Sequence, residues 1–186
     1  IWREDMSLPA RAIVDNDEVE IINYRKFIYD NDGNVTPNYI DRKVSISDIT
    51  SMDFYISYWM RGPVGHTFVG FNFKDEPPVV ISIEARYEAH ESYSPIASLF
   101  RQFELIYIVG DEKDVVQSRV QHRQEDVYRY RLNVSADGAQ RLFKEYLHRI
   151  NEIADYPEFY NLIRSNCTIN IFRYANRAGR SGSFDI

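Results

Sequence analysis

Residues 66–85 read HTFVGFNFKDEPPVVISIEA, two apolar runs separated by a short polar segment. Both runs are rich in β-branched and aromatic residues, which favours β-strands. The segment KDEPP between them is typical of a turn. We therefore predict a β-hairpin. In a direct register His66 lies opposite Glu84, with both side chains on one face and about 5 Å between their Cβ atoms, whereas a slip of one residue would separate them.

Further strands are predicted on both sides of this hairpin. The segments alternate apolar and polar residues or form short apolar runs, and both patterns are typical of strands. They are residues 18–29 (EVEIINYRKFIY), 43–46 (KVSI), 52–59 (MDFYISYW), 103–110 (FELIYIVG) and 126–134 (DVYRYRLNV). Short helical turns are expected at residues 95–100 and 111–120.

Two longer helices are predicted towards the C-terminal end. The first begins near Ser135, a favourable N-cap residue, and ends before Pro157. Its apolar residues recur at helical spacing. They are Leu142, Phe143, Tyr146, Leu147, Ile150 and Ile153. The second helix begins at Ser165 and Asn166 and continues to about Ala178.

The order of these elements, many strands followed by helices, indicates an α+β fold in which an antiparallel sheet packs against helices. At 186 residues, the chain has the length of one ordinary domain. No internal repeat and no linker divides it. We therefore expect residues 1–178 to form a single domain and residues 179–186 to form a flexible tail.

The composition excludes several classes of function. A net charge of −6 argues against nucleic acid, which needs a basic surface, and against simple electrostatic docking on anionic lipid. No run approaches the ~20 apolar residues of a membrane span. The sequence begins with Ile1 rather than Met, so we expect targeting or anchoring segments to lie outside it.

Cys167 is the only cysteine and lies in the segment RSNCTINIFRY, residues 164–174. As the first residue of the second predicted helix, it would meet the partial positive charge and the unpaired N–H groups of the helix N-terminus. These groups favour a thiolate and could bind an oxyanion. The alternative is a small buried apolar residue, which is a common role of a free cysteine.

A thiol nucleophile needs a base, and a third group orients the base. Among the four histidines, His66 begins an apolar strand after a Gly-Pro-Val-Gly loop, whereas the others lie in polar segments or on a helix surface. Glu84, opposite His66 in the predicted hairpin, is a carboxylate at the end of an apolar run. The alternatives are a structural histidine at a strand edge and a strand that simply ends in solvent.

Other candidate groups accompany these three residues. Asn166 and Tyr58 could stabilise an oxyanion, and Arg86 and Tyr93, in the segment EARYEAHESY, could line a substrate cleft. Core packing of Tyr58 and a solvated loop at EARYEAHESY are the alternatives. No HExxH motif, Cys/His cluster or glycine-rich phosphate loop is present, so we expect neither a metal nor a cofactor.

The order His66, Glu84, Cys167 resembles that of the circularly permuted papain-like thiol enzymes related to the NlpC-type peptidases. The Asn-Cys pair at 166–167 resembles the lecithin–retinol acyltransferase group, which is permuted in the same way. More closely, stretches across residues 19–173 resemble the Lnb N-terminal periplasmic domain family. These stretches are VEIINYRKFIY, YWMRGPVGHTFVGF, ISIEARYE, FRQFELIYIVGDE, EDVYRYRL and FYNLIRSNCTINIFR.

This resemblance implies a circularly permuted papain-like fold and a thiol acyltransferase at the periplasmic face of the Gram-negative inner membrane. Membrane contact would come through segments outside this sequence. An acyl chain would pass from a phospholipid donor, through a thioester on Cys167, to the N-terminus of a lipoprotein acceptor, with His66 as the base and Glu84 orienting it. Two other functions are open. One is a cysteine amidase or peptidase acting on peptidoglycan peptides, and the other is a non-catalytic envelope module that binds a partner.

Overall fold

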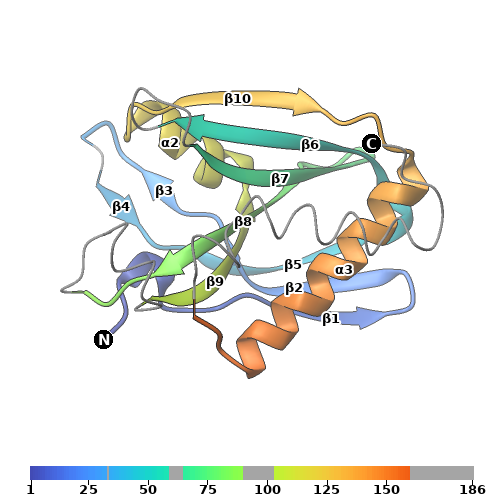
Figure 1. The fold of residues 1–186 in the computed structure, drawn as a ribbon, viewed down its shortest axis with the longest axis horizontal. Coiled ribbons are helices and arrows are strands. Elements are labelled where there is room, and N and C mark those ends of the chain that lie inside the picture. Colours follow the sequence, from blue (N-terminus) through green and yellow to red (C-terminus); the bar gives the residue numbers. More distant parts are fainter. Residues whose placement is uncertain (33, 59–64, 90–102, 160–186) are drawn as a thin grey trace.

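The computed structural model describes residues 1–32, 34–58, 65–89 and 103–159. They form one large sheet, a small two-stranded sheet and a few helical elements (Figure 1). The strands of the large sheet are β1 (Arg11–Asp15), β2 (Glu18–Arg25), β5 (Tyr39–Ser45), β6 (Ile49–Tyr58), β7 (His66–Phe73), β8 (Val79–Arg86), β9 (Glu104–Asp111) and β10 (Asp126–Arg131). The small sheet consists of β3 (Ile28–Tyr29) and β4 (Val35–Thr36). The helical elements are η1 (Glu4–Met6), η2 (Ile46–Asp48), η3 (Lys113–Gln117), α2 (Ser118–Gln121) and α3 (Ala136–Asp155).

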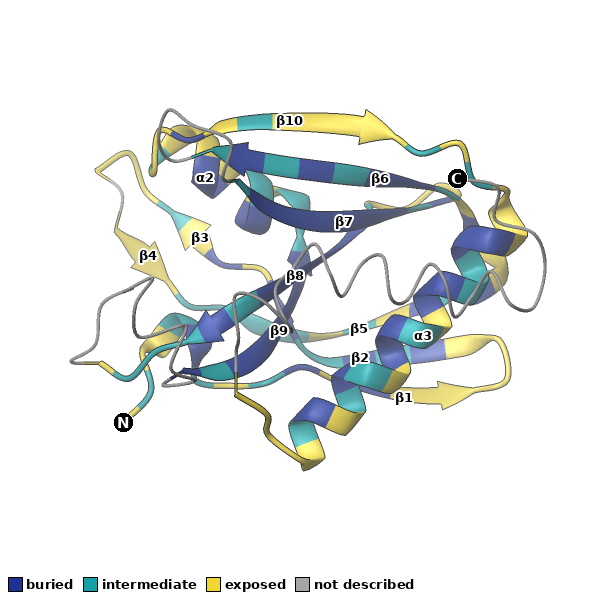
Figure 2. Ribbon diagram, in the orientation of Figure 1, coloured by how far each residue is buried: buried dark blue, intermediate teal, exposed yellow. Residues whose placement is uncertain are grey.

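The large sheet follows the order β1-β2-β9-β8-β7-β6-β10, and β5 also pairs with β2. Within the described part of the chain its pairs are antiparallel, except for the parallel contact of β2 with β9 at Arg25 and Gly110. The strands β1 and β10 stand at the two ends of this order and are largely exposed, whereas β7, β8 and β9 between them are buried (Figure 2).

The two faces of β7 and β8 meet different elements, because successive side chains of a strand point to opposite sides. On one side Phe71 and Ile81 belong to the main hydrophobic core, which α3 closes with its apolar face. Figure 1 shows α3 running diagonally across this face of the sheet. On the other side Phe68 packs with Val115 of η3 in a second, smaller core. At its centre, the sheet is therefore covered on both faces.

The helix α3 matches the prediction from the sequence. The hydroxyl of Ser135, its N-cap, accepts a hydrogen bond from the backbone N–H of Gly138 at 3.1 Å. All six residues of the predicted apolar face are buried. One of them, Phe143, packs edge-on against Phe71 with ring centroids 4.9 Å apart. The predicted hairpin of β7 and β8 is also confirmed, and its register is the direct one.

The predicted fold class is wrong. Instead of a papain-like α+β fold with an antiparallel sheet packed against helices, the described residues form a mixed, sheet-dominated fold. In these ranges ten strands accompany a single helix longer than five residues, because short β-rich runs are the commonest elements and residues 113–121 add only η3 and α2. The helices predicted at 95–100 and from Ser165 to Ala178, and the tail at 179–186, lie outside the described residues.

Candidate active site

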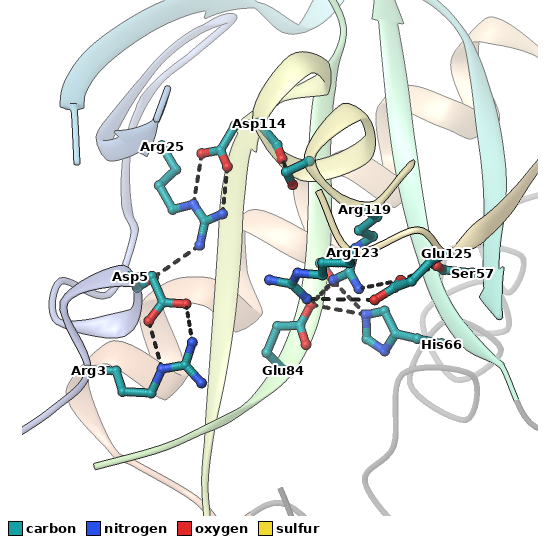
Figure 3. A network of polar contacts seen from close by, with 12 residues as sticks. Arg3, Asp5, Arg25, Ser57, His66, Glu84, Asp114, Arg119, Arg123 and Glu125 are labelled. Atoms are coloured by element: carbon teal, nitrogen blue, oxygen red, sulfur yellow. Dashed lines mark hydrogen bonds and ion pairs between the residues drawn. The ribbon is translucent and has the colours of Figure 1, made fainter. Parts of the chain in front are cut away.

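His66 and Glu84 come together where β7 begins and β8 ends. The register pairs Phe68 with Ser82, and its continuation places His66 opposite Glu84 on the same face. Nε2 of His66 lies 3.1 Å from Oε1 of Glu84 (Figure 3) and 2.7 Å from the hydroxyl oxygen of Ser82. The His66 side chain is only 11% exposed, so these contacts hold its ring in one orientation.

The hydrogen bonds indicate which nitrogen of His66 carries the proton. The Ser82 hydroxyl donates its single proton to Oε1 of Glu84, at a distance of 2.6 Å. Ser82 can then only accept from His66, and an ionised Glu84 can also only accept. Nε2 is therefore the N–H nitrogen of the neutral imidazole, and Nδ1 is its basic nitrogen.

Glu84 is held in its ionised form. Burial raises the pKa of this carboxyl group, but the positive charges of protonated His66 and of Arg119 and the hydrogen bonds from His66 and Ser82 act in the opposite direction. Together they hold the pKa of Glu84 well below its usual range. At neutral pH the carboxylate can therefore orient the imidazole and stabilise its protonated form.

Arg119 of α2 belongs to this cluster and was missed by the sequence analysis. Its Nη2 lies 2.5 Å from Oε1 of Glu84, and its Nη1 lies 3.4 Å from Oε2 of Glu125 (Figure 3). The guanidinium also lies over the ring of Phe68, 5.2 Å from the ring centroid. No local signal marks this arginine in the segment DVVQSRVQ, because its burial depends on how α2 packs against the sheet.

A second buried ion pair fixes the segment that carries Arg119. Nε and Nη2 of Arg25, in β2, lie 2.8 and 2.6 Å from the two carboxylate oxygens of Asp114, in η3 (Figure 3). The same carboxylate accepts hydrogen bonds from the backbone N–H of Phe27 and from the hydroxyl of Tyr29. Since η3 leads directly into α2, these contacts position Arg119 relative to Glu84.

Glu84 and Arg119 also line a cavity of about 350 Å³. The other charged residues of its lining are Arg3, Asp5, Arg25 and Arg123. Arg3 pairs with Asp5, and Arg25 pairs with Asp114. Because most of these charges are matched, the cavity is polar without a strong net charge, and it can admit water or a polar group next to the orienting carboxylate.

Tyr58 lies on the face of the sheet opposite to His66. It is the last residue of β6 and follows Ser57, which pairs with His66 in the β6–β7 register. Because neighbouring residues of a strand point to opposite sides, Ser57 shares the face of His66 and Tyr58 does not. The Tyr58 ring instead meets the ring of Tyr128 at 6.0 Å between centroids.

Arg86 anchors the N-terminal segment to the end of β8. Its Nε and Nη2 donate to the backbone carbonyls of Met6 and Ser7, at 2.9 and 2.7 Å. Its guanidinium also lies over the ring of Trp2, 4.1 Å from the centroid. Arg86 therefore holds η1 in place, and Asp5 and Met6 of η1 line the cavity beside Glu84.

The other predicted site residues, Cys167, Asn166 and Tyr93, lie outside the described residues. Among the residues that the structure describes, no group of three or more His, Cys, Asp or Glu side chains could hold a metal ion. No helix in the described ranges is long and apolar enough to cross a membrane.

Comparison with known proteins adds one finding. A family model described as the Lnb N-terminal periplasmic domain matches residues 35–185, a range that contains His66, Glu84 and Cys167. Neither the curated proteins nor the solved structures gave a match.

Proposed function

The chain belongs to the Lnb N-terminal periplasmic domain family, and we propose that it is a thiol acyltransferase of the Gram-negative cell envelope. The observation that carries this proposal is the contact of His66 Nε2 with an ionised Glu84, 3.1 Å away. A histidine whose Nε2 is held by a carboxylate presents Nδ1 as a base, which is the arrangement that activates a nucleophile. Cys167 is the nucleophile that we assign to it.

In the first proposed step, Nδ1 of His66 takes the proton of the Cys167 thiol, and the thiolate attacks the ester carbonyl of a phospholipid. The backbone N–H of Cys167 and the side chain of Asn166 stabilise the oxyanion of the tetrahedral intermediate. The intermediate collapses with cleavage of the ester C–O bond. His66 gives its proton to the leaving lysophospholipid oxygen, and the acyl group remains on Cys167 as a thioester.

In the second step, the amino group of a lipoprotein N-terminus attacks the thioester. His66 takes a proton from this amine and returns it to the departing sulfur of Cys167, so that an amide forms and the thiol is regenerated. Amines attack thioesters faster than esters, which is the chemical advantage of the covalent route. Glu84 stabilises the imidazolium that forms in both steps.

Both proposed substrates are lipids or lipid-anchored, so the domain must work at a membrane surface. Its net charge of −6 provides no attraction to anionic lipid. We therefore propose that membrane contact comes from segments outside this sequence. The domain alone should react with a small soluble ester but only poorly with phospholipid in bilayers.

A second candidate function is a cysteine amidase acting on peptidoglycan peptides with the same three residues. The polar lining of the cavity beside Glu84 favours it, since charged and polar peptides fit such a space better than an acyl chain does. The two functions share the acyl-enzyme and differ in the donor and the acceptor, so substrate experiments separate them.

The test of the proposed function is acylation of Cys167 by a small activated ester, p-nitrophenyl butyrate. Mass spectrometry should show one butyryl group on Cys167, removable by hydroxylamine as a thioester is. Cys167→Ser should not form this adduct, and His66→Ala should form it far more slowly. His148→Ala, which changes an exposed histidine of α3, is the matched control and should react like the wild type.

Further outcomes distinguish the three functions. Transfer of the butyryl group to the amino group of a short peptide supports the transferase. Efficient cleavage of peptidoglycan peptides, with no membrane present, would replace it by the amidase while leaving the catalytic residues as assigned. If Cys167 reacts with iodoacetamide equally fast in the wild type and in His66→Ala, the two residues are not coupled, and a non-catalytic module is the remaining function.

A further inference from the structure

The contacts around His66 continue beyond Glu84 and return to the neighbouring strand. Arg119 bridges Glu84 and Glu125 through its two terminal nitrogens. Glu125 in turn accepts a short hydrogen bond from the hydroxyl of Ser57. Ser57 is the direct cross-strand partner of His66 in the β6–β7 register. The contacts therefore form a ring, His66–Glu84–Arg119–Glu125–Ser57, which begins and ends on adjacent residues of the sheet (Figure 3).

The ring is largely removed from solvent. The side chains of Arg119 and Glu125 are each 8% exposed, and Ser57 is fully buried. Buried charges are costly unless oppositely charged groups meet them with good geometry. One guanidinium between two carboxylates meets this requirement only while all three side chains stay in place. The ring therefore fixes where Glu84 lies with respect to His66.

Three donors from the described residues converge on a single oxygen of Glu84. Ser82, Arg119 and His66 lie 2.6, 2.5 and 3.1 Å from Oε1, respectively. The negative charge that His66 meets on this oxygen is thus shared with a permanent cation. An imidazolium is bound less tightly by a shared carboxylate than by an unshared one, and it returns its proton more readily.

We propose that Arg119 is a positioning residue for the His66–Glu84 pair: it directs Oε1 at Nε2 and offsets part of the carboxylate charge, so that the protonated His66 can give up its proton. This inference rests on the proposed function, in which His66 must both accept and return a proton. Arg119 itself touches no reacting atom in this scheme. Its effect is carried by Glu84.

Two charges of the ring should have opposite effects on the pH at which His66 titrates. On the His66 side of the sheet, the charged groups of the described elements nearest to His66 are Glu84 of β8, Arg119 of α2, and Arg123 and Glu125 after α2. Farther along the same side lie Tyr55 and Asp53 of β6. The hydroxyl of Tyr55 is bonded to Glu112, and Arg129 and Arg131 of β10 are paired with Asp53. Removing the positive charge of Arg119 should move the titration of His66 to higher pH. Removing the negative charge of Glu125 should move it to lower pH. Damage to the fold would not invert the sign in this way.

The experiment is an NMR titration of the His66 imidazole in the wild type and in Arg119→Met, Arg119→Lys and Glu125→Gln. The midpoint should rise on the order of one pH unit in Arg119→Met, stay close to the wild type in Arg119→Lys, and fall in Glu125→Gln. The pH–rate profile for acylation of Cys167 should move in the same directions. Arg129→Met is the matched control, because Arg129 binds the buried Asp53 outside the ring, and it should leave the midpoint unchanged.

An unchanged midpoint in Arg119→Met, or a shift of equal size in Arg129→Met, overturns the inference. If Arg119→Met does not fold, Glu125→Gln decides, because it leaves Arg119 bound to Glu84. The midpoint is measured without any acylation of the thiol. Expected shifts without acylation of wild-type Cys167 would therefore support the role of Arg119 and contradict the proposed function, whereas acylation with unmoved midpoints would contradict the inference alone.

Discussion

Arg25 and Asp114 are separated by 89 residues in the sequence and form a bidentate ion pair in which both side chains are buried. The pair joins β2, near one end of the sheet, to η3, which covers its second face. Because α2 follows η3 without a break, this contact and the ring around His66 depend on the same packed segment. The stability of the second face and the geometry of the site are thus linked.

Asp114→Asn tests the contribution of this ion pair to stability. The substitution leaves the guanidinium of Arg25 buried without its counter-charge, so the free energy of unfolding should fall by about 3–5 kcal/mol. Denaturant unfolding measures it. Asp155→Asn is the control, since it breaks the Arg11–Asp155 pair, whose side chains are 45% and 50% exposed, and should cost less than about 1 kcal/mol. Equal losses in the two variants would contradict the assigned role of burial.

Glu84→Gln separates orientation from nucleophilic attack. Glutamine keeps the size of the side chain but can no longer stabilise the imidazolium, so acylation of Cys167 should slow on the order of a hundredfold or more. The loss should still be smaller than in Cys167→Ala. The fold should survive, because Arg119 keeps its contact with Glu125. Acylation rates and thermal unfolding check both statements, and an unfolded variant would instead assign Glu84 a structural role.

The lowered pKa of Glu84 also makes stability depend on pH. A carboxyl group whose pKa is lower in the folded than in the unfolded state stabilises the fold fully above the unfolded value, about 4.3. This contribution is lost as the pH falls through the folded value. The difference in free energy of unfolding between the wild type and Glu84→Gln should therefore shrink as the pH drops below about 4.3. Denaturant titrations at several pH values measure this difference. If it grows in acid, the pKa of Glu84 is not lowered by folding.

Gly110 allows β9 to approach β2 closely. A Cβ atom at this position would lie 2.7 Å from the backbone oxygen of Arg25, whereas one at Gly70 would lie 2.9 Å from a ring carbon of Tyr55. A ring can shift more easily than the backbone of a paired strand. Gly110→Ala should therefore destabilise the protein by about 3 kcal/mol or more, and Gly70→Ala by about 1 kcal/mol. Denaturant unfolding of both variants tests this order. An equal or smaller loss of unfolding free energy in Gly110→Ala than in Gly70→Ala would contradict it.

The sequence by itself determined the helix α3 and the hairpin of β7 and β8. The N-cap Ser135 and the apolar spacing from Leu142 to Ile153 lie within one segment, and helical geometry relates them without reference to the rest of the chain. Likewise, two apolar runs around a turn are enough to predict the hairpin. Its direct register, which places His66 opposite Glu84, was one of two that the sequence left open, and the structure decided it.

Only the tertiary structure decided the order of the strands, the fold class and the burial of Arg119. The order of site residues along a chain says nothing about how many strands pair around the site, and for this reason the papain-like α+β prediction is wrong. Arg119 has no apolar pattern of its own. It is buried because Glu84 and Glu125, from separate parts of the chain, bring opposite charges to it and offset the cost of removing it from water. Such long-range pairing leaves no periodic signal in the sequence, since the partners meet only when the sheet and α2 have packed together.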